Sequence, residues 1–491
     1  PLHDRLVTLA AALLALLDER DTSRQVYAAI DREFQRCVDD FELTAATDQI
    51  PGYAADRRLF RLYTDRIQRR QAYAQAEMGS NRCRSCAGYC TACRMRRVGS
   101  AGPPDSPRAQ GVIMSFSFTA EHDQFRAALQ RFLTDHADPA AVRTAMASAH
   151  GIDRAAWQRA CADLGLAGIR IPEADGGAGF GYVELGIAVE ELGRHLFCAP
   201  FFTSVVLAAE AILAAATPPF RESLLPSIAD GTTIATLALA EAGGVCDPAA
   251  VAMTATTDGD GVRLSGTKHY VLDGASADVV LVVARAAGTQ GGAGVSLYLV
   301  DPASDGLARR AVATLDPTRR LAVLEFDNVR AECISVPGDA GAALARALDR
   351  ATIMLANEMA GGCQVMLDTA VGYAQLRMQF GRPIGSFQAI KHKCADMLLE
   401  VEHAKSAAYY AAAAIDADDA RIPALAALAK ATAAEAYVHA ATECIQIHGG
   451  IGFTWDHDTH LWFKRAKSSE MLLGSPAWHR ERYLRAVEVA A

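Results

Sequence analysis

The spacing of hydrophobic and polar positions changes twice along the chain. From residue 114 to about 231, apolar residues recur at helical spacing between glycine-rich loops. Between 232 and about 338, short apolar or alternating runs are separated by Gly, Asp and Ser, which is typical of strands in an antiparallel sheet. Helical periodicity then returns, and it predicts helices over 341–377, 386–415, 421–447 and 458–488.

This order of helices, strands and helices predicts an α+β chain with a β domain between two helical ones. We place an N-terminal helical domain at 114–231, a middle antiparallel β domain at 232–338 and a C-terminal four-helix bundle at 339–491. Residues 1–113 are helical at first and then become a cysteine-rich run and a Pro/Gly-rich linker. Because Thr119 is a plausible helix N-cap just after Met114, we expect the functional protein to begin near Met114. The preceding segment would be a fused or mistranslated extension.

Composition and charge narrow the classes of function. The 491 residues are 51% hydrophobic and 21% charged, so the chain can bury a large core. A net charge of −9 argues against a nucleic-acid footprint. No apolar run approaches the roughly 18 residues that would suggest a membrane span. Most of the twelve cysteines are scattered singly, as is usual for reduced thiols, and we expect a cytoplasmic protein.

Four of the cysteines form a compact motif in the N-terminal extension. Cys83, Cys86, Cys90 and Cys93 are spaced C-x2-C-x3-C-x2-C, and thiolates at that spacing can hold zinc or an iron–sulfur cluster. However, the loop between the two pairs is very short and few apolar residues surround them. We therefore favour an unstructured or artefactual segment, and we predict no metal site elsewhere.

Two stretches at the ends of the C-terminal helices combine polar, aromatic and glycine residues. One is "RMQFGRPIGSFQAIK" (377–391) and the other is "IQIHGGIGF" (445–453). Consecutive glycines let a phosphate approach the main chain, an arginine can pair with a pyrophosphate, and phenylalanines can cover a flat ring. Each stretch alone could be an ordinary helix stop or a tight turn with buried aromatics. Together they favour a nucleotide-binding function.

Residues 114–491 resemble the acyl-CoA dehydrogenase family, in particular actinobacterial subunits of heteromeric steroid or branched-chain acyl-CoA dehydrogenases. The resemblance rests on both stretches, on "WQRACADLGLAGIRIPEADGGAGFG" (157–181) and on "LSGTKHYVLDGASADVVLVVAR" (264–285). It implies FAD as cofactor, an acyl-CoA substrate in fatty acid or steroid side-chain degradation, a trans-2-enoyl-CoA product and an electron-transfer flavoprotein as acceptor. It also implies a dimer or heterotetramer in which these residues bind the ADP end of a neighbouring chain's FAD: Arg377, Gln379, Phe380, Phe387, Gln388, Gln446, His448, Gly449 and Gly450.

The resemblance fails where the family has its catalytic base and its flavin-bonding hydroxyls. Counting from the motifs, the two places for the glutamate base fall on Leu473 and Ala351. Ala240 and Leu272 stand where the family has threonines that bond the flavin, and Tyr270 stands where it often has tryptophan. The side chains at the two base positions, Leu473 and Ala351, cannot accept a proton.

Three interpretations follow from these substitutions. The chain could be the non-catalytic half of a heteromer whose partner supplies the base, and we favour this interpretation. It could be a self-sufficient enzyme with a displaced base, for which Glu470 is the first candidate and Glu358 the second. It could also be a flavin-free structural or acyl-CoA-binding subunit. Small residues at Gly361, Gly362 and Cys363 suggest room for a bulky acyl chain.

Overall fold

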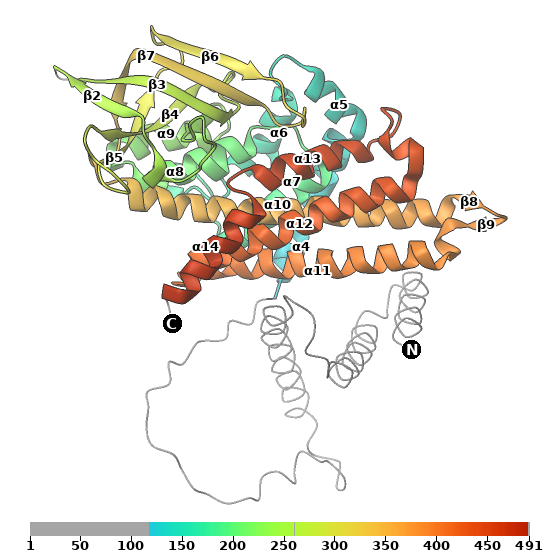
Figure 1. The fold of residues 1–491 in the computed structure, drawn as a ribbon. Coiled ribbons are helices and arrows are strands. Elements are labelled where there is room, and N and C mark those ends of the chain that lie inside the picture. Colours follow the sequence, from blue (N-terminus) through green and yellow to red (C-terminus); the bar gives the residue numbers. More distant parts are fainter. Residues whose placement is uncertain (1–116, 260, 490–491) are drawn as a thin grey trace, which may run out of the picture. The chain divides into compact units, whose positions relative to one another are not determined.

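The computed structural model describes residues 117–259 and 261–489 (Figure 1). All of them lie in the second of two compact units, which spans Phe116–Ala491. The cysteine motif and the rest of the predicted extension at 1–113 lie outside the described residues.

The first described segment is a group of helices. Its N-cap prediction is confirmed, because the Thr119 hydroxyl accepts a hydrogen bond from the His122 backbone N–H, and the His122 ring accepts one from the Thr119 N–H. The helices are α4 (Ala120–His136), α5 (Pro139–Ala147), α6 (Arg154–Leu164), α7 (Tyr182–His195), the π-helix η4 (Phe202–Ala209), α8 (Glu210–Ala215) and α9 (Pro218–Ala229). Short 3-10 turns η2 (Leu166–Gly168) and η3 (Glu173–Asp175) link α6 to α7.

The middle segment forms a seven-stranded sheet. Its strands are β1 (Ala235–Ala238), β2 (Thr254–Asp258), β3 (Gly261–Leu272), β4 (Val279–Ala286), β5 (Val295–Val300), β6 (Leu307–Val312) and β7 (Leu321–Cys333). They run in the order β1-β4-β2-β3-β7-β5, with β6 beside β7, and β4 also pairs with β5. Most pairs are antiparallel, as predicted, while β1 and β2 run parallel to β4. Residues 313–320 form the turn between β6 and β7.

The last segment is a set of long helices. They are α10 (Gly341–Leu376), α11 (Gln388–Asp416), α12 (Ile422–His448), α13 (Thr459–Met471) and α14 (Pro476–Val489). The chain turns from α10 to α11 through a small hairpin of β8 (Met378–Gln379) and β9 (Arg382–Pro383), followed by η6 (Ile384–Ser386). One helix was predicted over 458–488, but the chain forms two. The break follows from positive φ at Leu473 (57°) and Gly474 (110°), which no helix accommodates.

The helical–β–helical architecture predicted from the sequence is confirmed, but the idea of spare room on α10 is wrong. A Cβ on Gly361 would lie 2.0 Å from the Glu190 carbonyl oxygen of α7, and one on Gly193 of α7 would lie 2.3 Å from the Glu358 carbonyl oxygen. A Cβ on Gly362 would lie 2.4 Å from the Tyr437 ring. These glycines therefore let helices cross closely, and they leave no space for an acyl chain.

Candidate functional site

The two motif stretches meet at one end of the C-terminal helices. Because α10, α11 and α12 alternate in direction, the end of α10, the start of α11 and the end of α12 lie together, beside the β8–β9 hairpin (Figure 1). The Tyr373 ring of α10 stacks on the His448 ring of α12, with centroids 4.1 Å apart and planes at 24°. We call residues 376–388 and 446–455 at this end the tip.

The tip presents polar and aromatic side chains to solvent. Phe380 is 90% exposed and Phe453 is 71% exposed. In the part of the chain that the structure describes, four exposed polar side chains of the tip have no side-chain hydrogen bond or ion pair: Arg377, Gln379, Gln388 and Gln446. A Cβ placed on Gly449 or Gly450 would meet nothing within 4 Å, so the main chain is open to a ligand there. This combination fits a flat ring with a pyrophosphate, and hence FAD.

Phe387 and His448 are placed differently from the other predicted residues. Phe387 is partly buried, its ring meets Phe380 edge-on at 6.0 Å, and the Arg382 guanidinium lies 4.2 Å above it. His448 is buried, its Nδ1 lies 2.7 Å from the Cys444 carbonyl oxygen, and burial lowers its pKa. The structure therefore gives His448 a role in shaping the end of α12, beneath the glycine pair.

The loop that contains Ala240, residues 240–247, is fixed by a buried lysine. The Lys268 ammonium donates to the Leu239 carbonyl at 3.0 Å and to the Glu241 carboxylate at 2.9 Å. Ala240 and Leu272 are both buried and apolar. Tyr270 is 52% exposed and has a φ of 57° at a bulge of β3. The hydroxyls that the resemblance implies are therefore absent both in the loop, at Ala240, and at the end of β3, at Leu272.

Neither place for the catalytic base carries a group that could act as one. Ala351 is buried within α10, and Leu473 is buried in the break between α13 and α14. Beneath that break, the Lys430 ammonium donates to the carbonyls of Glu470, at 3.1 Å, and Gly474, at 2.9 Å. Burial lowers the pKa of Lys430 to about 7. The Glu470 carboxylate forms an ion pair with Lys467, one helical turn before it.

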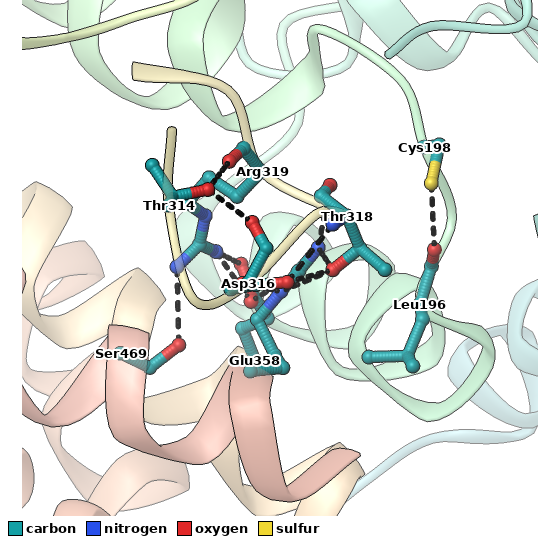
Figure 2. Close-up of polar contacts among 9 residues, drawn as sticks. Leu196, Cys198, Thr314, Asp316, Thr318, Arg319, Glu358 and Ser469 are labelled. Carbon is teal, nitrogen blue, oxygen red and sulfur yellow. Dashed lines mark hydrogen bonds and ion pairs between the residues drawn. The ribbon is translucent and has the colours of Figure 1, made fainter. Parts of the chain in front are cut away.

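Glu358, the other candidate, belongs to a buried cluster that crosses between domains. Arg319, in the 313–320 turn, donates through Nη2 to both carboxylate oxygens of Glu358, at 2.6 and 2.8 Å. Its Nη1 donates to the Ser469 hydroxyl of α13 at 3.1 Å. Figure 2 shows Asp316, Thr318 and Arg319 of the turn next to Glu358 and Ser469.

A second arginine makes the reciprocal connection. Arg465 of α13 donates through Nε to Asp316 at 2.9 Å and through Nη2 to the Thr318 hydroxyl at 2.7 Å, both in the 313–320 turn. Its Nη1 also donates to Glu358 at 3.0 Å. The nearby carboxylates raise the pKa of Arg465 although burial opposes them. Two guanidinium groups thus bind the Glu358 carboxylate. This arrangement is typical of a structural ion pair and not of a catalytic base that is free to accept a proton.

A small cavity of about 40 Å³ lies beside this cluster. Leu272, Phe202, Arg319, Glu358 and Arg465 are among the residues that line it. Asp273 also faces it, and burial raises the pKa of Asp273 to about 6 while the Thr203 hydroxyl donates to it at 2.6 Å.

Sequence reasoning missed Asp273, Arg319, Arg465 and Asp316. The stretch "LDPTRR" (315–320) has the polar composition of an exposed turn, and nothing local indicates that its end is buried. Within residues 117–259 and 261–489, no three His, Cys, Asp or Glu side chains are grouped to hold a metal ion. In the same ranges, no helix has the length and apolar character needed to cross a membrane.

Comparisons with known proteins agree with this fold. Three domain models match: acyl-CoA dehydrogenase N-terminal domain at 119–232, middle domain at 236–329 and C-terminal domain at 340–488. The acyl-CoA dehydrogenase IpdE2 of Mycobacterium tuberculosis is 38% identical over 356 residues, which cover 72% of this chain and 94% of IpdE2.

Two solved structures of paired chains are also similar. A variant of the Tcur3481-Tcur3483 steroid ACAD aligns with a TM-score of 0.68 and 34% identity, over 75% of this chain and 98% of that one. The ChsE4-ChsE5 complex from Mycobacterium tuberculosis aligns with a TM-score of 0.69 and 29% identity, over 76% of this chain and 99% of that one. From the matched domains, the fold and the tip, we conclude that the chain belongs to the acyl-CoA dehydrogenase family of FAD-dependent oxidoreductases.

Proposed function

We propose that this chain is the non-catalytic half of a heteromeric acyl-CoA dehydrogenase. The assembly would convert an acyl-CoA thioester to a trans-2-enoyl-CoA, and an electron-transfer flavoprotein would accept the electrons. This chain would hold the ADP end of an FAD through its tip, while the partner chain would hold the flavin ring and supply the base. FAD, when bound, supplies the acceptor for the hydride that leaves the substrate.

One observation carries the proposal: the tip is open and polar, whereas both base positions are buried and apolar. Removing the proton next to a thioester carbonyl requires a carboxylate within hydrogen-bonding reach. Leu473 and Ala351 cannot provide one, and the nearby Glu358 is held by two arginines. The solved ChsE4-ChsE5 pair gives a precedent for two different chains in one assembly.

A self-sufficient enzyme remains the second candidate because of Glu470. This carboxylate is about a fifth exposed and lies one helical turn before Leu473. Its partner Lys467 is on the same helix, so a rotation of either side chain would free it. A flavin-free structural subunit is disfavoured by the exposed, unpaired polar groups of the tip.

The test compares flavin content and turnover of the chain alone with those of the chain co-purified with a second dehydrogenase-like chain. We expect little flavin in the chain alone, and flavin with acyl-CoA-dependent bleaching in the pair. Arg377→Ala should weaken FAD retention by the pair about tenfold, because a charge-assisted hydrogen bond to phosphate is worth about 1.5–3 kcal/mol. Gln446→Ala should have a smaller effect in the same direction.

Arg421→Ala is the matched control, since Arg421 occupies an exposed helix–helix turn at the opposite end of α11. It should leave FAD retention unchanged. Unchanged retention in both Arg377→Ala and Gln446→Ala would overturn the role of the tip. Bleaching by the chain alone, abolished in Glu470→Gln, would favour the self-sufficient enzyme.

A further inference from the structure

The Arg319 and Arg465 contacts connect the middle β segment to the C-terminal helices in both directions. Arg319 reaches from the 313–320 turn to Glu358 on α10 and Ser469 on α13. Arg465 reaches from α13 back to Asp316 and Thr318 in the turn. Each side therefore contributes one arginine and one carboxylate.

All four charged side chains are withdrawn from water. Asp316 is 1% exposed, Glu358 and Arg465 are each 6% exposed, and Arg319 is 8% exposed. Their charges cancel, and the hydroxyls of Thr318 and Ser469 satisfy further donors. Such a cluster adds little net stability compared with apolar residues, but the loss of one member leaves a buried charge without a partner. It therefore fixes one arrangement of the two segments and penalises others.

The cluster also lies where this chain would otherwise receive ligand. Leu272, which stands at a flavin-bonding position, lines the same cavity as Arg319, Glu358 and Arg465. Ser469 is four residues before Leu473, and Glu358 is seven residues after Ala351 on the same helix, so the cluster draws on the same parts of the chain as both expected base positions. Phe197, Phe201 and Phe202 also line this cavity.

We propose that Asp316, Arg319, Glu358 and Arg465 form an interdomain clasp that keeps this chain's own half-site closed without a ligand. The half-site is the cavity lined by Leu272, Asp273, Arg319, Glu358 and Arg465. This inference rests on the proposed function, because a non-catalytic half has no ligand of its own to hold the two segments together. The clasp takes over that task, so the 313–320 turn stays in place whether FAD is bound or absent.

Trypsin offers a direct readout, since Arg319 and Arg320 are cleavage sites within the turn. In the FAD-free full chain, we expect the turn to resist trypsin. Glu358→Gln retains both cleavage sites but weakens both guanidinium contacts. Because cleavage of a transiently opened segment follows the population of the open form, the cut in 313–320 should become at least about tenfold faster in this variant. Fragment masses identify the cut.

Glu481→Gln is the control, because Glu481 forms an exposed ion pair with Arg485 on α14. It should leave the cleavage rate unchanged. A rate in Glu358→Gln equal to that of the unmodified chain would overturn the clasp. So would an unmodified chain that resists trypsin only when FAD and the partner are bound, because the ligand would then be closing the half-site.

A double-mutant cycle tests the clasp independently of trypsin. If Glu358→Gln alone does not fold, recovery of folding in the double variant Arg319→Met with Glu358→Gln takes the place of the missing unfolding temperature. Arg319→Met with Glu358→Gln should unfold at a higher temperature than the sum of the single effects predicts, since no charge is then left buried alone. The exposed pair Arg485→Met with Glu481→Gln should be additive, and additivity in both cycles would overturn the clasp. These assays need no flavin, whereas the proposed function is tested by flavin content and turnover. A failure of the clasp can therefore be told apart from a failure of the proposed function.

Discussion

Asp273 and Thr203 join two parts of the chain through a single short hydrogen bond. Thr203 lies in η4, and Asp273 follows β3 with a φ of 49°. The carboxyl group is buried, which raises its pKa to about 6, although the Thr203 hydroxyl and the guanidinium groups of Arg319, Arg465 and Arg320 partly oppose the shift. The side chain therefore changes its charge within an ordinary range of buffers.

The free energy of unfolding should respond to this residue with a definite sign. Because the folded pKa exceeds the unfolded value of 3.8, folding favours the protonated form, and this contribution is lost as pH rises through about 6. Asp273→Asn cannot ionise, still accepts from Thr203 and tolerates positive φ. Relative to this variant, the unmodified protein should lose about 2 kcal/mol between pH 4 and 7. Urea unfolding across that range measures it, and parallel curves for the two proteins would refute the assignment.

At this scale, the sequence could place only residues that belong to a linear motif. Counting from the motifs locates the tip residues and the two expected base positions, and the FAD-binding role of the tip stays a prediction. Arg319 and Arg465 are 146 positions apart in the numbering and meet only after the β6–β7 turn has packed between two helices. No local pattern distinguishes them from surface arginines.

Helices α7 and α10 cross at reciprocal glycines. Gly193 of α7 faces the Glu358 carbonyl, and Gly361 of α10 faces the Glu190 carbonyl. Two helix backbones can approach this closely only where both lack a Cβ. The contact sets the position of Glu358, and hence one half of the clasp.

An added methyl group at this crossing should force the two helices apart. Gly361→Ala should lower the free energy of unfolding by about 1–3 kcal/mol or more, as overpacking generally does. Gly372→Ala is a matched control on the same helix, where a Cβ meets nothing within 4 Å. It should be neutral or stabilise by up to about 1 kcal/mol, because alanine favours the helix more than glycine. Chemical unfolding of both variants measures the contrast, and equal effects would contradict the crossing.

Helix periodicity predicted α10, α11 and α12 to within about two residues at each end. It failed at 458–488, where α13 and α14 are separated by Leu473 and Gly474 with positive φ. Leucine is an excellent helix former, so its left-handed conformation has no signal in the local sequence. Tertiary contacts impose it, including the Lys430 ammonium that binds the carbonyls on either side.

Two regions within residues 117–259 and 261–489 have opposite properties. The tip leaves polar groups unpaired and aromatic rings exposed, whereas the clasp residues are buried and paired with one another. The order of the segments was predictable because hydrophobic spacing changes with secondary structure. The relation between the tip and the clasp could not be predicted, since it depends on how the N-terminal helices, the β sheet and the C-terminal helices pack together.

The boundary near Met114 remains a prediction, and deletion tests it. A chain that begins at Met114 should unfold within about 2 °C of the full-length protein, because the matched domains start at residue 119. It should also form the same complex and retain the same flavin. A large drop in the unfolding temperature, or loss of the complex, would show that residues 1–113 contribute to the functional unit.

The burial of the clasp has a consequence for the response to dissolved salt. Mobile ions screen charges that they can approach, and they screen buried pairs much less. Arg377 is open to them, whereas Arg319 and Arg465 are enclosed. If the tip binds FAD as proposed, rising ionic strength should therefore weaken that binding well before it weakens the contacts among Asp316, Arg319, Glu358 and Arg465.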